Sequence, residues 1–207
     1  IHYTLDGSEP TAASPRYTGP VEIGKSARFR ATALREGGEN ASYSREFAFS
    51  KSTGRPAVLN TKPNDSYTFE GASLLVDGYH SRPVFTSGAW LGYLDEPLDV
   101  TIDMGGEQSY RSVELETLAE KGDWIFPPSS VTVWVSDNGT DFTEVASVAV
   151  PEAKAGDADG IGRYRMQFPE TSARYLKVVA QNAAAIPAWH PGAGSKGFLF
   201  VDEVVVE

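Results

Sequence analysis

Hydrophobic and polar residues alternate with a period of two along most of the chain. Three segments show the alternation most clearly: residues 98–104, 131–135 and 163–168. In the first of them, one face carries Leu98, Val100, Ile102 and Met104. The segment most like a helix, residues 110–121, alternates in the same way. This period is typical of strands with one buried face, and it predicts an all-β protein.

Turn-forming residues separate the predicted strands. Gly, Pro, Asn and Asp recur between the short apolar runs. Asn138-Gly139 lies between residues 131–135 and a returning strand at 142–148, and this pair predicts a type I′ hairpin. Many short strands joined by such turns are typical of a β-sandwich or jelly roll.

The pattern divides the chain into two domains. Residues 1–52 form a small unit with predicted strands at 27–33 and 43–49, and its length is marginal for an independent core. Residues 53–65, which begin with Thr-Gly-Arg-Pro, are interpreted as a linker. Residues 66–207 form the second domain.

Charge separates the two domains as well. The chain has 207 residues and a formal net charge of −10. Residues 1–55 hold 6 acidic and 8 basic residues, whereas residues 56–207 hold 22 acidic and 10 basic ones. An acidic domain repels phosphate backbones and anionic lipid surfaces. We therefore expect neither nucleic acid nor membrane insertion, whereas a neutral sugar is indifferent to this charge.

The chain begins with Ile1 inside a strand-like run, and it has neither an initiating Met nor a leader peptide. We interpret it as a piece of a longer protein whose export signal lies upstream. It contains no cysteine, which excludes disulfides, Cys-based zinc sites and a thiol nucleophile. No apolar run approaches the ~20 residues of a transmembrane helix.

Residues 1–50 resemble the chitobiase/β-hexosaminidase C-terminal domain. The string YTLDGSEPT at residues 3–11 carries the resemblance, with Ser14, Tyr17 and a small-residue strand after it. The resemblance implies a small Ig-like or fibronectin-like β-sandwich, here incomplete because its usual first strand is missing.

Residues 66–207 resemble the coagulation factor 5/8 type C, or discoidin, domain, a galactose-binding-like jelly-roll sandwich that includes family 32 carbohydrate-binding modules. The resemblance rests on the order of LVDG at 75–78, Trp90, VTIDMG at 100–105, VSDNG at 135–139, ARYLKV at 173–178 and VDEV at 201–204.

The two domains in this order resemble the tail of a family 20 glycoside hydrolase, a bacterial β-N-acetylhexosaminidase. The tract WHPGAG at 189–194 supports that subgroup. The resemblance implies a non-catalytic accessory region of an exported enzyme, located in the periplasm, at the cell surface or outside the cell. Its first partner would be an upstream catalytic (β/α)₈ barrel, a fold of about 250 residues.

No constellation in the sequence predicts catalysis. Glu114 and Glu116 share a strand face, and Glu36 and Glu39 flank a Gly-Gly turn. Both pairs are interpreted as solvated surface, because exposed Glu is the norm. The sequence has no Gly-x-Ser-x-Gly, phosphate-loop or His-Glu-x-x-His motif.

The discoidin resemblance also implies a structural calcium ion. Asp77 and Glu203 would supply carboxylate oxygens, the hard ligands that calcium prefers. Further oxygens are expected from Leu74, Tyr79 and either Ser81 or Ser87. Alternatively, Asp77 only caps a turn and Glu203 pairs with a cation. The Asp157-Ala158-Asp159 stretch is interpreted as a flexible acidic loop, and Arg174 as the ion-pair partner of a strand residue such as Asp103.

Aromatic residues in predicted loops are the candidate sugar site, because a ring face binds the apolar face of a sugar. The candidates are Trp90 and Tyr93 in one loop, Trp124 and Phe126 in a second, and Trp189 and His190 in a third. Hydrogen bonds are expected from Arg82, His80 and Asn182. The alternative is that these rings plug the sandwich as core.

Two functions remain open. One is binding of a glycan with terminal galactose or N-acetylhexosamine. The other is a purely structural module that packs on the absent catalytic barrel, which predicts a large exposed apolar patch.

Overall fold

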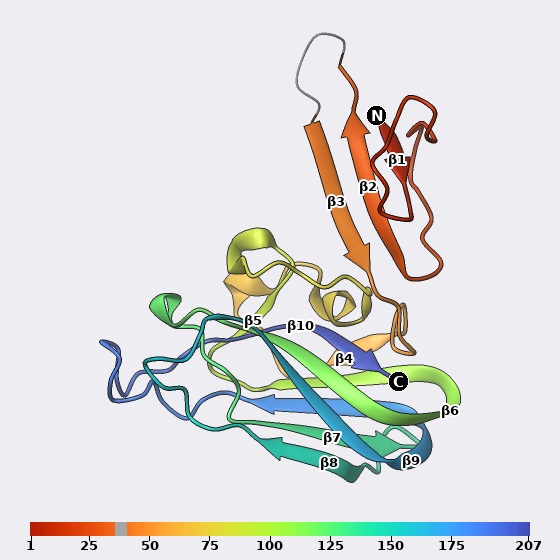
Figure 1. Ribbon diagram of the computed structural model, residues 1–207. Coiled ribbons are helices and arrows are strands. Elements are labelled where there is room, and N and C mark those ends of the chain that lie inside the picture. The colour runs from red at the N-terminus through yellow and green to blue at the C-terminus, as the bar shows by residue number, and fades with distance from the viewer. Residues whose placement is uncertain (36–40) are drawn as a thin grey trace. The chain divides into compact units, whose positions relative to one another are not determined.

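The computed structural model describes residues 1–35 and 41–207 (Figure 1). These residues form two compact units. The first comprises residues 1–49 and 78–80, and the second comprises residues 50–77 and 81–207. The pair Glu36 and Glu39 lies outside the described residues.

The first unit contains one antiparallel sheet in the order β1(His2–Thr4), β2(Ala27–Ala33), β3(Ala41–Phe47). Phe29 on β2 lies between two rings, at 5.9 Å from Tyr3 and 6.3 Å from Tyr43 between centroids. In the predicted turn, the Asp6 carboxylate accepts hydrogen bonds from the hydroxyl and the backbone N–H of Ser8, which lower its pKa. The described part of the expected sandwich is therefore a single sheet.

The second unit is a β-sandwich with four short 3₁₀ turns. Its strands are β4(Ala57–Leu59), β5(Leu91–Tyr93), β6(Leu98–Ala119), β7(Ser130–Ser136), β8(Thr143–Ala149), β9(Gly160–Gln181) and β10(Leu199–Val206). The 3₁₀ turns are η1(Asp65–Tyr67), η2(Gly71–Val76), η3(Phe85–Ser87) and η4(Lys121–Asp123). The all-β prediction is confirmed, and residues 110–119 belong to a strand.

The two layers of this sandwich share their longest strands. β6 and β9 have 22 residues each and curve from one layer into the other (Figure 1). In one layer, the first half of β6 pairs with β4 on one side and with the end of β9 on the other. The end of β9 also pairs with β7, and β7 pairs with β8. In the other layer, the second half of β6 pairs with the start of β9 on one side and with β10 on the other. Strand β10 also pairs with β5.

The space between the layers holds the main core. The predicted face of residues 98–104 is fully buried there, as are Val131, Val133, Leu176 and Val178. Burying one such side chain stabilises the fold by about 1.5–3 kcal/mol. Where β6 and β9 leave the first layer, Arg174 donates to both carboxylate oxygens of Asp103, at 2.9 and 2.8 Å, so this predicted pair is confirmed.

A second, smaller core covers the outer face of the β10 layer. It contains Trp90, Leu118, Ile125 and Phe200, with Tyr67 packed against them. The Phe200 ring lies 4.7 Å from the Tyr67 ring. Side chains alternate along β10, so Phe200 points outward while its neighbours Leu199 and Val201 point into the main core.

Two local expectations differ from the structure. Residues 53–65, expected as a linker, contain β4 and the first residue of η1, and they belong to the second unit, because β4 pairs with β6. The two-residue hairpin at Asn138-Gly139 is wrong. Strands β7 and β8 are joined by six residues, and Asn138 Oδ1 accepts the N–H groups of Thr140 and Asp141, both at 2.9 Å. Of the pair, only Gly139 has a positive φ, whereas a type I′ turn needs two.

Candidate functional site: the crossover-loop end

Three long loops meet at one end of the second unit. Residues 120–129 join β6 to β7, residues 150–159 join β8 to β9, and residues 182–198 join β9 to β10. Each loop connects one layer of the sandwich to the other at this same end. We call this region the crossover-loop end. It brings together the predicted loops of Trp124 and Trp189.

His190 connects two of these loops. Its Nε2 donates to the Lys121 carbonyl oxygen at 3.0 Å, and its Nδ1 accepts the Gly192 N–H at 3.0 Å, which defines a neutral tautomer. The ring is largely buried and lies edge-on to Trp124 at 6.0 Å and to Trp189 at 5.6 Å. His190 is therefore a support between the two tryptophans, with both ring nitrogens already engaged.

Lys121 ties the third loop to the other two. Its buried ammonium group pairs with the Asp159 carboxylate and donates to the Asp157 carbonyl oxygen at 2.9 Å. Asp159 also accepts the Lys121 backbone N–H at 3.1 Å, and these bonds lower the pKa of Asp159. The loop interpreted as a flexible acidic segment is thus anchored by a buried cation.

Trp124 and Trp189 are exposed at 42% and 40% of their surface. Trp124 has a left-handed backbone, φ +64°, and its ring lies so close to Gly192 that a Cβ there would meet it at 2.8 Å. Trp189 donates through Nε1 to the Ala153 carbonyl oxygen at 2.9 Å. Both rings are held from one side and open to solvent on another.

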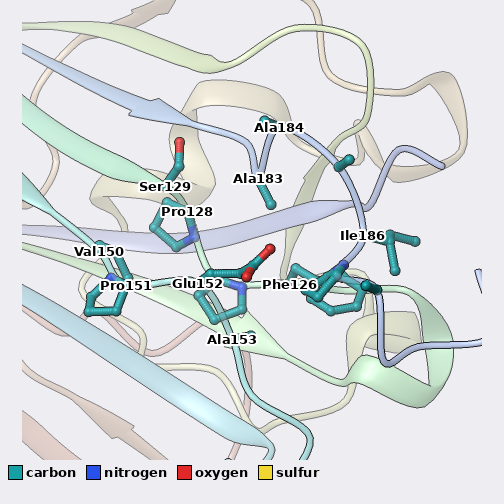
Figure 2. A pocket seen from close by; sticks show the side chains of 14 residues that line it. Phe126, Pro128, Ser129, Val150, Pro151, Glu152, Ala153, Ala183, Ala184 and Ile186 are labelled. Carbon is teal, nitrogen blue, oxygen red and sulfur yellow. The ribbon is translucent and has the colours of Figure 1, made fainter. Parts of the chain in front are cut away.

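A hollow of about 340 Å³ opens between the three loops (Figure 2), and its lining includes Ala188, the residue before Trp189. Its lining is Phe126, Pro127, Pro128, Ser129, Val150, Pro151, Glu152, Ala153 and residues 183–188. Phe126 is buried, and its ring lies 6.4 Å from the Trp189 ring. Figure 2 shows the Glu152 carboxyl group projecting into the space near Phe126 and Ala183. This volume matches the lower range of small-ligand pockets.

Trp90 and Tyr93 were expected as exposed sugar platforms, and the structure buries both completely. Trp90 lies in the second core, and its Nε1 donates to the Arg82 carbonyl oxygen at 3.0 Å. Tyr93 lies on β5 in the main core, where burial raises the pKa of its hydroxyl. Segments that pack over the outer face cover Trp90, and the two layers enclose Tyr93, so neither ring offers a face to a ligand.

The three predicted hydrogen-bonding residues occupy different places. Arg82 is exposed and uses its carbonyl oxygen to hold Trp90. His80 is half-buried and belongs to the first unit. Asn182 turns its amide group toward β5 and donates to the Tyr93 carbonyl oxygen at 3.0 Å. None of these three residues lines the hollow.

The predicted calcium ligands are divided between the units. In the second unit, Leu74 lies in η2, Asp77 follows its last residue, and Glu203 lies on β10. Tyr79 belongs to the first unit, where its ring lies 6.2 Å from Phe47 and 3.8 Å from the Arg45 guanidinium carbon. Within residues 1–35 and 41–207, no three Asp, Glu, His or Cys side chains are grouped as a metal site. The predicted set contains two carboxylates and relies otherwise on carbonyl oxygens.

A β-bulge gathers buried acids near Glu203. Between Val201 and Val204, β10 places two residues, Asp202 and Glu203, opposite Glu116 alone. All three side chains are buried. Burial raises the pKa of Asp202 to about 8, and the neighbouring acids Glu116 and Asp77 add to this shift. The expectation that Glu116 is solvated is wrong, because it lies under the covered outer face and pairs with Arg163.

Sequence reasoning missed the residues that shape this end. Lys121 carries no signal of burial, since lysine is rarely buried and its partner Asp159 is 38 positions away. Glu152 resembles any exposed acid. The run Ala183-Ala184-Ala185 and the Pro127-Pro128 pair were the available signals, because small and rigid residues leave room for a hollow.

Comparisons with known proteins agree with this architecture. Residues 1–47 match the family described as Fn3 associated, and residues 60–196 match the family described as F5/8 type C domain. A comparison with curated proteins finds no match. Among the described residues, no helix has the length and apolar character needed to span a membrane.

Several solved structures are similar over about three quarters of the chain. A chitosan-binding module of a chitosanase/glucanase from Paenibacillus sp. IK-5 has 17% identity and a TM-score of 0.49, over 76% of this chain and 98% of that one. The module CpGH89CBM32-5 from Clostridium perfringens, in complex with GalNAc-β-1,3-galactose, has 16% identity and a TM-score of 0.47, over 73% and 93%. A fucose-binding module from Streptococcus pneumoniae has 22% identity and a TM-score of 0.47, over 76% and 94%.

The family assignment itself rests on the matched segment. Residues 60–196 make up about two thirds of the chain and include all of the second unit's strands except β4 and β10. The chain therefore belongs to the F5/8 type C domain family.

Proposed function

We propose that the second unit binds carbohydrate at the crossover-loop end. One observation carries the proposal: Trp124 and Trp189 are exposed, fixed by neighbouring groups, and both packed edge-on against His190. An exposed, rigid indole ring next to a pocket fits the apolar face of a sugar ring at a small entropic cost. Most tryptophans are largely buried, so two exposed ones at one end of a sandwich favour a binding role.

Charge at this end supports a neutral ligand. The loops 120–129 and 150–159 contain five acidic residues, and the only buried cation of the three loops, Lys121, is neutralised by Asp159. A polyanion would meet no matching positive surface there. Chemically, the site offers stacking faces, a hollow and hydrogen-bond acceptors, with no nucleophile arranged against a base.

The resemblance of the two domains to the tail of a family 20 glycoside hydrolase extends the proposal. On this basis the chain is the non-catalytic accessory region of an exported bacterial β-N-acetylhexosaminidase, and the glycan carries terminal galactose or N-acetylhexosamine. Binding by such a region would hold the enzyme on its substrate by raising the local concentration.

The experiment is a glycan array with the chain 1–207, followed by calorimetry on the best ligand. Trp124→Ala and Trp189→Ala should each weaken binding at least tenfold while the thermal unfolding temperature stays within a few degrees. Trp134→Ala, a half-buried residue on β7 outside the loop end, is the matched control. An array without hits, or equal binding by all three variants, would overturn the proposal.

A calcium ion near Asp77 and Glu203 is a second part of the proposal. The residues fit the ion in type, because carboxylates and loop carbonyls are its usual ligands, and the bulge at Asp202 and Glu203 gathers buried carboxyl groups. A bound divalent cation would fix the end of η2 against β10. Its expected role is structural.

A structural role is the second candidate, and it is favoured by the first unit. That unit exposes Ile1, Leu5, Tyr17, Leu34 and Tyr43, and it has an open hollow of about 210 Å³ lined by Phe29 and Tyr43 among others. Exposed apolar surface of this kind is typical of contact with another domain. Loss of solubility or of hydrolase activity on deleting residues 1–49 from the full protein would support this role.

A further inference from the structure

We propose that the hollow beside Trp189 is a subsite for the acetamido group of an N-acetylhexosamine, and that it makes the crossover-loop end prefer acetylated to unacetylated sugars. The inference deepens the proposed function and rests on it, since it chooses between the two sugar classes left open above. It follows from the lining of the hollow, the position of Trp189 and the chemistry of Glu152.

The walls of the hollow are apolar and made of small residues. Prolines and alanines from all three crossover loops form most of its lining, and Phe126 and Ile186 close it from the buried side. Small side chains leave a volume of about 340 Å³ that a methyl group can enter without displacing protein atoms. A hydroxyl group pressed against the same wall would lose its hydrogen bonds to water without replacement.

Only two of the lining residues carry polar side-chain groups, Ser129 and Glu152. The Ser129 hydroxyl donates to the Asn182 carbonyl oxygen at 2.9 Å, so it is engaged with its own loop. The Glu152 carboxylate accepts hydrogen bonds and projects into the hollow (Figure 2). An apolar wall beside one acceptor matches the methyl group and the N–H group of an acetamide.

Trp189 places a sugar ring at the rim of this hollow. Its Nε1 donates a hydrogen bond to the carbonyl oxygen of Ala153, which belongs to the lining. Ala188, the residue before Trp189, belongs to the lining as well. Phe126 lies 6.4 Å from the Trp189 ring and forms the floor. A hexose stacked on Trp189 can therefore direct one ring substituent into the hollow while its other hydroxyls stay in water.

The test compares sugars that differ only at this substituent. Calorimetry with the chain 1–207 would measure N-acetylglucosamine against glucose and glucosamine, and N-acetylgalactosamine against galactose. We expect the acetylated member of at least one series to bind about tenfold tighter or more, because a buried methyl group and a hydrogen bond to a carboxylate both contribute. The affinity for glucosamine should not exceed the affinity for N-acetylglucosamine.

Three variants locate the effect. Ala183→Leu fills the hollow and should remove the preference for the acetylated sugar. Glu152→Ala should weaken N-acetylhexosamine binding about fivefold to tenfold, whereas Glu152→Gln, which retains an acceptor, should weaken it less. Glu144→Ala, an exposed glutamate on β8 outside the lining, is the matched control and should have no effect.

Each outcome separates this inference from the proposed function. Equal binding of acetylated and unacetylated sugars, still dependent on Trp189, would overturn the subsite alone. Tighter binding of glucosamine that is lost in Glu152→Gln would also overturn it, because the carboxylate would then recognise an ammonium group. No binding of any sugar would overturn both. If thermal unfolding shows that Ala183→Leu is not folded, the Glu152 variants and the sugar series test the subsite without it.

Discussion

Trp90 and the pair Trp124 and Trp189 are the same residue type in two regions of one sandwich, with opposite exposure. Trp90 is fully buried in the second core, whereas the other two expose 42% and 40% of their surface. Hydrogen bonding does not explain the difference, because Trp90 and Trp189 each donate through Nε1 to a backbone carbonyl oxygen. The difference lies in what covers the ring.

The second core is covered because the 3₁₀ segments before β5 pack over the outer face of the β10 layer. Tyr67 from η1 and Phe85 from η3 both contact Phe200, with ring centroids 4.7 and 5.7 Å from the Phe200 centroid. At the crossover-loop end the loops instead support the tryptophans from below, through His190 and Gly192. Aromatic rings are thus core where a second layer of chain covers them, and a candidate binding surface where loops only hold them in place.

The largest expected effect is on stability in the covered region. Trp90→Ala should lower the free energy of unfolding by about 3–5 kcal/mol, because it leaves a cavity in a packed core. Trp189→Ala, measured in the same urea titrations, should change it by less than about 1 kcal/mol, because the ring is exposed. Similar losses for the two variants would remove the distinction between the regions.

Calcium should stabilise the covered region more than the loop end. With calcium at one hundred times its dissociation constant, the free energy of unfolding should rise by about 2.7 kcal/mol. Thermal unfolding with calcium and with a chelator checks this, and Asp77→Asn should abolish the difference. An unfolding temperature that does not depend on calcium would contradict the proposed ion.

A smaller effect is expected from the buried lysine at the loop end. Lys121→Ala removes the bonds to Asp159 and to the Asp157 carbonyl, and it should cost about 1–2 kcal/mol of stability. Sugar affinity should fall as well, since the loops that carry both tryptophans lose a common anchor. Lys154→Ala, an exposed lysine in the same 150–159 loop, is the control and should be neutral in both assays.

The smallest effect concerns Asp103 and Arg174, which lie away from both aromatic regions. Hydrogen bonds from Arg174 lower the pKa of Asp103 to about 2. A carboxylate with a lowered pKa stabilises the fold above its unfolded pKa of about 3.9, and this contribution is lost as the pH falls toward 2. The stability gap between wild type and Asp103→Asn should therefore narrow between pH 4 and pH 2. A stability difference that does not change with pH would contradict the lowered pKa of Asp103.

Much of the second unit followed from the sequence because period-two alternation is a local property. The buried face of residues 98–104 and the pairing of Arg174 with Asp103 were both predicted correctly. The six-residue connection after β7 was not, because the Asn138 side chain organises a longer loop in place of a tight turn.

The exposure of single tryptophans could not be predicted in the same way. Trp90, Trp124 and Trp189 all lie in Gly- and Pro-rich surroundings, and the sequence does not say which loops are covered. Coverage of Trp90 depends on residues 67 and 85 from distant turns, and the hollow depends on three loops that meet only after the layers form. These are properties of tertiary packing.

Tryptophan fluorescence during a sugar titration tests the central claim most directly. The chain contains four tryptophans, Trp90, Trp124, Trp134 and Trp189. We predict an emission change on adding N-acetylhexosamine that persists in Trp134→Phe and disappears in the double variant Trp124→Phe/Trp189→Phe. An emission change that survives the double variant would contradict the claim, because the sugar would then bind away from the exposed pair.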